Sequence, residues 1–69
     1  MINRLETAIS REQTISISYW ALGQPEPQIH QVEPLRLQRR NQLLYMYAYS
    51  YRAEAYLTFR LDRVQQMEI

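Results

Sequence analysis

The N-terminal residues carry apolar side chains at helical spacing. Leu5, Ala8 and Ile9 occupy positions i, i+3 and i+4, so they share one face of a helix. We place this helix at about residues 3–11. Because a helix this short is not stable alone in water, we expect it to pack against the rest of the chain.

Beyond the predicted helix, the apolar spacing changes to a period of two. Ile15, Ile17 and Tyr19 alternate with serines, a pattern typical of a half-buried strand. The predicted barrel therefore begins at about residue 14. The segment 23–27 contains one glycine and two prolines and predicts the loop that ends this first strand region.

A second strand is predicted over about residues 28–38, with an irregularity in its middle. Val32 and Leu35 have opposite parity along this segment. Pro34 lies between them and has no N–H to donate to a strand ladder. We therefore expect a bulge or bend near Glu33-Pro34, and a long bent strand favours a sheet that closes on itself.

The C-terminal half contains three more alternating segments. The predicted strands cover residues 42–49, 56–61 and 64–69. Asn41, in the turn over residues 39–41, is the residue there that best tolerates a left-handed backbone. The predicted fold is mainly β: a short N-terminal helix followed by a five-stranded, strongly bent small β-barrel over residues 14–69.

Composition narrows the class of protein. A chain of 69 residues forms one domain, residues 1–69. Without cysteine it has neither disulfides nor a thiolate metal site, and a single histidine makes a metal centre improbable. We expect no metal and no cofactor. His30 has no obvious Ser or Asp arranged with it as a catalytic group, so we expect a protein that is not an enzyme.

Charge and hydropathy bear on the expected location and binding partners of the protein. No apolar run approaches the roughly 20 residues of a membrane span, and no signal-peptide pattern is visible, so we expect a cytoplasmic protein without membrane contact. The formal net charge of +1 argues against bulk electrostatic binding of nucleic acid. However, all eight basic residues are arginines, which grip phosphates and stack on aromatic rings.

Several motifs resemble the WYL domain of bacterial regulators. Ile17-Ser18-Tyr19 is similar to the end of that family's first strand, and residues 30–35 are similar to its step from a basic residue to Pro-Leu. Leu44-Tyr45-Met46 stands where the family has Trp-Tyr-Leu. Residues 57–64 resemble the closing signature Arg-x-Phe-Arg-Leu-Asp-Arg-Ile. The resemblance covers almost the whole chain and implies an Sm-like barrel with a ligand-sensing or nucleic-acid-binding face.

Three positions depart from the family pattern. Leu44 replaces the tryptophan, Leu57 replaces the first arginine of the closing signature, and His30 replaces the usual arginine. The last two changes remove charge where the resemblance implies a ligand site. They are compatible with an altered ligand, with weaker binding, or with a domain kept for assembly.

The resemblance also bears on partners. Typical members of the family carry a helix-turn-helix domain before this unit and often another domain after it. We expect this chain to be a stand-alone unit that does not read an operator by itself. A separate DNA-binding protein is therefore a candidate partner.

The resemblance implies a small regulatory ligand-binding module that modulates transcription or defence-related regulation. Its expected ligand is a single-stranded nucleic acid or a nucleotide. The candidate ligand-binding residues are Tyr19, His30, Tyr45, Arg60 and Arg63. Tyrosines would stack on bases, at about 1–3 kcal/mol per base, while arginines hold phosphates and His30 contributes in a pH-sensitive way.

An alternative interpretation is a structural protein that forms a homo-oligomer without binding nucleic acid. Tyrosines are abundant in the C-terminal half and are good strand residues that also suit interfaces. They are Tyr45, Tyr47, Tyr49, Tyr51 and Tyr56. Exposed barrel edges and a small core favour assembly in the same way. Arg63 is open to a similar alternative, a pairing with a nearby carboxylate.

Overall fold

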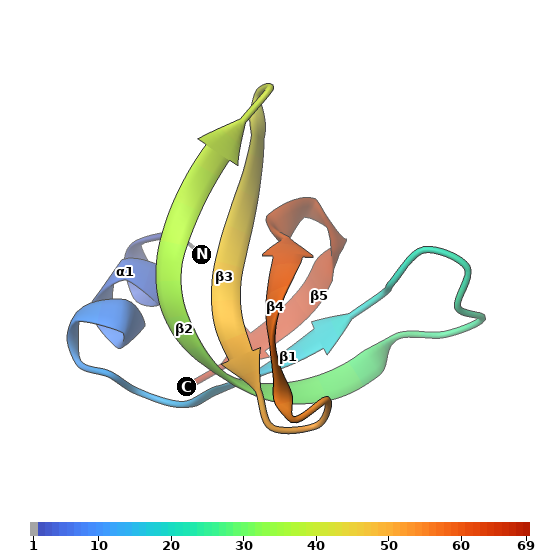
Figure 1. Ribbon diagram of the computed structural model, residues 1–69, viewed down its shortest axis with the longest axis horizontal. Coiled ribbons are helices and arrows are strands. Elements are labelled where there is room, and N and C mark those ends of the chain that lie inside the picture. Colours follow the sequence, from blue (N-terminus) through green and yellow to red (C-terminus); the bar gives the residue numbers. More distant parts are fainter. Residues whose placement is uncertain (1) are drawn as a thin grey trace.

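The computed structural model describes residues 2–69 as one helix followed by a curved antiparallel sheet (Figure 1). The elements are α1 (Ile2–Ser10), β1 (Ile15–Tyr19), β2 (Gln28–Arg40), β3 (Leu43–Ser50), β4 (Ala55–Arg60), the 3-10 helix η1 (Leu61–Arg63) and β5 (Val64–Glu68). The predicted mainly-β fold, with one short N-terminal helix and then five strands, is confirmed in outline. None of the described helices is both long and apolar enough to cross a membrane.

The sheet is open, so the predicted closure into a barrel is not confirmed. The strand order is β4-β3-β2-β1-β5, and β4 and β5 form its two edges. The chain turns through η1 between these edges, and no backbone ladder joins them. Instead, the Tyr19 hydroxyl on β1 accepts a hydrogen bond from the backbone N–H of Arg60 at the end of β4, at 3.1 Å. One side chain spans the gap where a closed barrel has a strand ladder.

The irregularity in β2 lies one residue later than predicted. The register with β3 shifts between Pro34 and Arg36, which makes Leu35 the extra residue of a bulge. Leu35 is exposed, whereas Leu37 packs against the core. The extra residue returns the apolar residue after it to the side of the sheet on which Val32 and Pro34 lie. The strand can therefore bend and still bury its apolar side chains.

The turn between β2 and β3 is shorter than predicted. β2 continues through Arg40, and the turn consists of Asn41 and Gln42, both with positive φ, at 51° and 69°. The left-handed backbone expected at Asn41 is confirmed. Placing Gln42 in the third strand was wrong, because a two-residue turn of this kind needs left-handed backbone at both positions. In Figure 1 the resulting hairpin extends beyond the rest of the sheet.

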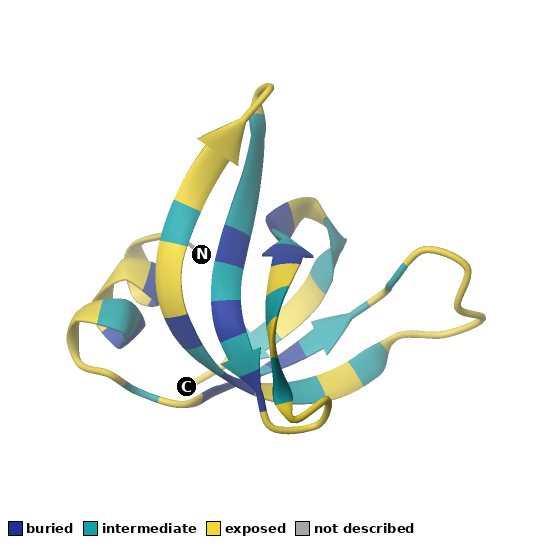
Figure 2. Ribbon diagram, in the orientation of Figure 1, coloured by how far each residue is buried: buried dark blue, intermediate teal, exposed yellow. Residues whose placement is uncertain are grey.

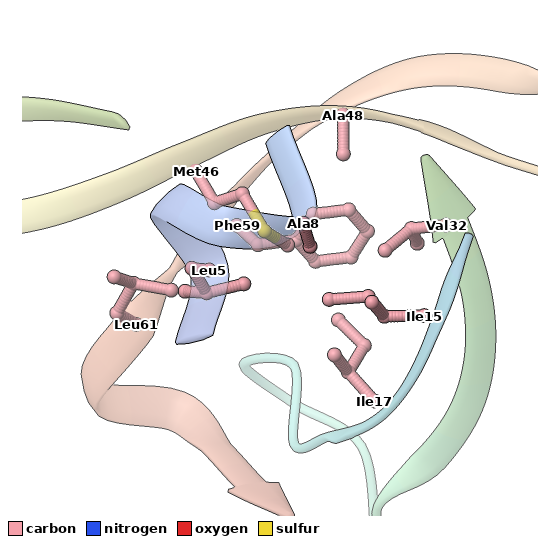
Figure 3. Packing of buried hydrophobic residues seen from close by; sticks show 9 residues of the cluster. All are labelled: Leu5, Ala8, Ile15, Ile17, Val32, Met46, Ala48, Phe59 and Leu61. Atoms are coloured by element: carbon pink, nitrogen blue, oxygen red, sulfur yellow. The ribbon is translucent and has the colours of Figure 1, made fainter. Parts of the chain in front are cut away.

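A single apolar core fills the concave side of the sheet (Figure 3). Phe59 on β4 lies among residues of α1, β1, β2 and β3 and is only 2% exposed. The core residues are Leu5, Ala8, Ile15, Ile17, Val32, Met46, Ala48, Phe59 and Leu61. The helix is held by this contact, as its length requires.

Burial alternates along β4 and along β3 from Tyr45 to Ser50, whereas in β2 the alternation is interrupted at the bulge (Figure 2). On β3, Met46, Ala48 and Ser50 are buried, while the tyrosines between them are half-buried. Neighbouring strands put directly paired residues on the same side of a sheet. We call the side opposite the core the outward face. It carries Tyr45 and Arg60, two of the five predicted site residues.

Candidate functional site

The structure divides the five predicted site residues into two groups. Tyr19 and His30 lie on the core side of the sheet, in contact with Phe59. Tyr45 and Arg60 are direct partners across β3 and β4 and lie on the outward face. Arg63 lies in η1, three residues beyond Arg60.

The first group belongs to an aromatic cluster at the end of the core. Tyr19 meets Phe59 edge-on with ring centroids 4.9 Å apart, and His30 meets Phe59 at 5.3 Å. The centroids of Tyr19 and His30 are 6.3 Å apart. We call Tyr19, His30, Phe59 and Ser50 the inward cluster. Since edge-on contacts and a hydroxyl bond fix the Tyr19 ring, its packing ties the sheet together at its open side.

Ser50 links His30 to the turn that precedes β4. Its hydroxyl is fully buried, shares a hydrogen bond with His30 Nδ1 at 3.0 Å, and accepts one from the Ala53 N–H at 3.2 Å. Burial lowers the pKa of His30 below its usual value of 6.5, and the positive charge of Arg52 lowers it further. His30 is thus held mainly neutral at neutral pH, which suits its apolar surroundings.

The second group forms a row across the outward face. Gln38 on β2, Tyr45 on β3 and Arg60 on β4 are successive partners in the strand register. We call these three residues the outward row. A half-exposed tyrosine ring beside a guanidinium offers both a stacking surface and a cation.

Arg60 is already paired with a carboxylate of its own chain. Its Nε and a terminal nitrogen donate to Asp62 at 3.1 and 2.6 Å, a bidentate contact. This hydrogen bond raises the pKa of Arg60 and lowers the pKa of Asp62. The positive charge of Arg63 also lowers the pKa of Asp62. Asp62 therefore lies between two predicted phosphate-binding arginines, and an anionic ligand has to compete with it.

The outward face holds cationic and aromatic groups beyond the five predicted site residues. Arg36 lies over the Tyr47 ring at 4.8 Å, and Arg40 over the Tyr45 ring at 5.8 Å. Tyr47 also stacks on Tyr56 with centroids 5.9 Å apart. Arg36 and Arg40 have the same parity, which is a signal in the sequence. Their positions over tyrosines follow only from the hairpin register.

Charge is unevenly distributed along the chain in this region. Residues 34–53 include four arginines and no acidic residue. The hairpin of β2 and β3 falls entirely within that stretch apart from the start of β2. Within residues 2–69, no group of three or more His, Cys, Asp or Glu side chains is placed to hold a metal ion. The cationic and aromatic groups of this face are guanidiniums and phenols.

Comparison with known proteins agrees with this architecture. The sequence matches the WYL domain over residues 1–69. The chain belongs to the WYL domain family. Its structure is similar to proteasome accessory factor B/C (PafBC) of Arthrobacter aurescens, with a TM-score of 0.89 and 30% sequence identity. That match covers 97% of this chain and 10% of the PafBC chain, so this WYL domain spans about a tenth of PafBC. No curated protein matches it.

The structure explains where this WYL domain departs from the motifs of its family. Leu44 is half-buried and packs against the core together with Leu57. His30 points to the core side and contacts Phe59. All three substitutions therefore lie on the concave side of the sheet, and none of them alters the outward row.

Proposed function

We propose that this WYL domain is a non-enzymatic regulatory module that binds single-stranded nucleic acid or a nucleotide through its outward face. In this proposal Tyr45 stacks on a base, and Arg60 and Arg63 bind phosphate oxygens. Tyr19 and His30 act as positioning residues, because Tyr19 holds the Arg60 backbone and His30 packs beneath it on Phe59. Binding would modulate transcription or defence-related regulation, with a separate DNA-binding protein as the candidate partner.

The observation that carries the proposal is the register pairing of Tyr45 with Arg60, with Arg40 lying over the same tyrosine ring. A ring with guanidinium groups on either side accommodates a base and its flanking phosphates at once.

Arg36 over Tyr47 repeats only the contact between a guanidinium and a ring. The rest differs, because Thr58 is the partner of Tyr47 on β4 and Tyr56 stacks on the same ring. The proposed base-stacking site is therefore Tyr45, and Arg36 adds a further cation along the hairpin.

The test is fluorescence anisotropy of a labelled single-stranded oligonucleotide of about 12 nucleotides, titrated over a salt series. We expect Arg60→Ala with Arg63→Ala to weaken binding at least about tenfold. The double variant should also reduce the slope of log affinity against log salt by roughly 1.4, since each lost phosphate contact on a single strand accounts for about 0.7.

A matched control removes the same charge elsewhere. Arg4 lies in α1 and Arg11 directly follows it, and both are exposed. Replacing both by alanine should leave the affinity within about twofold of the parent. Equal losses of affinity for the two double variants would show that binding depends on overall charge and not on a defined site. Unchanged affinity for the Arg60 and Arg63 variant would overturn the proposal.

A second candidate function is assembly into a homo-oligomer. The specific observation that favours it is the free edge of β4. Light scattering at several protein concentrations tests this role, and a monomer at every concentration contradicts it.

A further inference from the structure

The β4 strand has a hydrogen-bonding side that no other strand covers. It pairs with β3 in an uninterrupted register from Ala55 to Arg60 and is the last strand in the order. In Figure 1, β3 lies along one side of β4, and no described strand is paired to the other. Unpaired strand edges are templates for pairing with another strand.

The main-chain groups on this free side can be assigned. In an antiparallel pair, alternate residues direct both N–H and C=O toward the neighbouring strand. The Arg60 N–H is bonded to Tyr19 instead of β3, so Arg60 belongs to the residues that face away. By alternation, Thr58 and Tyr56 also face away. Since Arg60 is already bonded, Tyr56 and Thr58 supply the free donors and acceptors.

The other edge, β5, is less suited to pairing. It is a five-residue strand in which Gln65, Gln66 and Glu68 are exposed. Its register with β1 is irregular next to Tyr19. By contrast, β4 is regular and carries Tyr, Leu, Thr and Phe in sequence, with no proline, lysine or bulge to protect it.

We propose that a second copy of this chain pairs with β4 in an antiparallel arrangement about a two-fold axis at Leu57. Tyr56 of each copy then lies opposite Thr58 of the other, and all of the free main-chain groups of these two residues find partners. Each Arg60 keeps its own bond to Tyr19.

The charges at the two ends of β4 favour this self-pairing. Glu54 immediately precedes the strand, and at its other end Asp62 pairs with Arg60 and leaves Arg63 as the surplus positive charge. An antiparallel two-fold brings the acidic end of each β4 beside the basic end of the other. A parallel alignment would bring like charges together, which is unfavourable in neighbouring strands. An identical copy is therefore complementary in both hydrogen bonding and charge.

Pairing of this kind would join the two sheets edge to edge. A two-fold axis normal to the sheet leaves both outward faces on the same side, so their tyrosines and arginines form one continuous surface. The inference deepens the second candidate function, assembly through the free edge of β4, and does not depend on what the outward face binds.

Disulfide trapping tests the register directly, because the chain contains no cysteine. With the axis at Leu57, residue 57 faces its own counterpart with Cα atoms about 4.5 Å apart, within the range for a disulfide. We expect Leu57→Cys to form a covalent dimer under mild oxidation, seen on a non-reducing gel. Thr58→Cys is the matched control and should crosslink far less. Equal or preferential trapping through Thr58→Cys would overturn the register.

Proline substitution tests the edge itself. Thr58→Pro removes an N–H that faces the free side while leaving the ladder to β3 intact, and Thr58→Val is the control. We expect sedimentation to show a dimer for the parent and for Thr58→Val, and half that mass for Thr58→Pro. A monomeric parent at high concentration, or a dimer that survives Thr58→Pro, overturns the inference. Circular dichroism shows whether Thr58→Pro is folded, and if it is not, the cysteine variants still decide.

Discussion

The inward cluster and the outward row are built from similar residues but differ in what those residues can reach. On the core side, Tyr19 and His30 pack edge-on against Phe59, and their polar atoms are bonded within the chain. On the outward face, the Tyr45 ring is half-buried beside Arg60, with Arg40 over it. The same tyrosine chemistry serves packing on one side and, in the proposed function, ligand contact on the other.

The difference shows that a matching motif does not give each of its residues the same role. Tyr19 is fixed by a partner on β4, so a change there acts on the fold first. Tyr45 has cationic neighbours that are not buried, so a change there should act first on the proposed binding. Four substitutions separate the two roles.

Removing the centre of the inward cluster should have the largest effect. Phe59→Ala leaves a cavity in the core and should lower the free energy of unfolding by about 3–5 kcal/mol, most of what a domain this small possesses. Urea denaturation followed by circular dichroism measures this loss of unfolding free energy. Tyr47→Ala on the outward face is the control and should cost clearly less. Equal costs would remove the distinction between the two sides.

Removing only hydroxyl groups gives a finer comparison. Tyr19→Phe deprives the Arg60 N–H of its acceptor and should lower the free energy of unfolding by about 0.5–1.5 kcal/mol. Tyr45→Phe retains the outward ring and should change stability by less than about 0.5 kcal/mol. Thermal melts of both variants provide the measurement. A larger loss for Tyr45→Phe would contradict the assigned roles.

Asp62 offers a test confined to the outward side. Asp62→Asn removes the carboxylate that occupies Arg60, so affinity for the labelled oligonucleotide should rise by roughly two- to fivefold. The anisotropy titration measures this change, with Glu68→Gln as a control for net charge. Weaker binding by Asp62→Asn would mean that Asp62 orients Arg60 for the ligand instead of competing with it.

The smallest effect should be a pH dependence from the inward side. The pKa of folded His30 is lowered by burial and by Arg52, whereas the unfolded chain keeps a value near 6.5. Between those two pKa values the unfolded state binds more protons, so stability should fall as the pH drops below about 6.5. Unfolding free energies measured over this range should show a shallower slope in His30→Gln. An identical slope would exclude His30 as the source.

Much of the fold was predictable because the information is local. Strand alternation, the Gly- and Pro-containing loop and the left-handed Asn41 are properties of short segments. The open sheet was not predictable in this way. How its two edges lie depends on the bond between Tyr19 and Arg60, which are 41 residues apart, and on how η1 redirects the chain.

The candidate site was predictable in its residue types but not in its grouping. The motifs identified Tyr19, Tyr45 and Arg60, yet a sequence does not state on which side of the sheet a side chain finds its neighbours. The two-residue turn and the bulge at Leu35 set the register that puts Arg36 over Tyr47. A shift of one residue in the register of β2 would move each of its side chains to the opposite face of the sheet.

The sequence by itself determined the family, the order of helix and strands, and the alternation that separates core from surface. The family follows from short sequence motifs, and the elements and their alternation follow from the period of the apolar residues. Both are properties of residues close together in the sequence. Only the tertiary structure decided that Tyr45 pairs with Arg60, that Asp62 occupies that arginine, and that one side of β4 stays open. These depend on register and on contacts between distant segments, which become defined only when the chain is packed around Phe59.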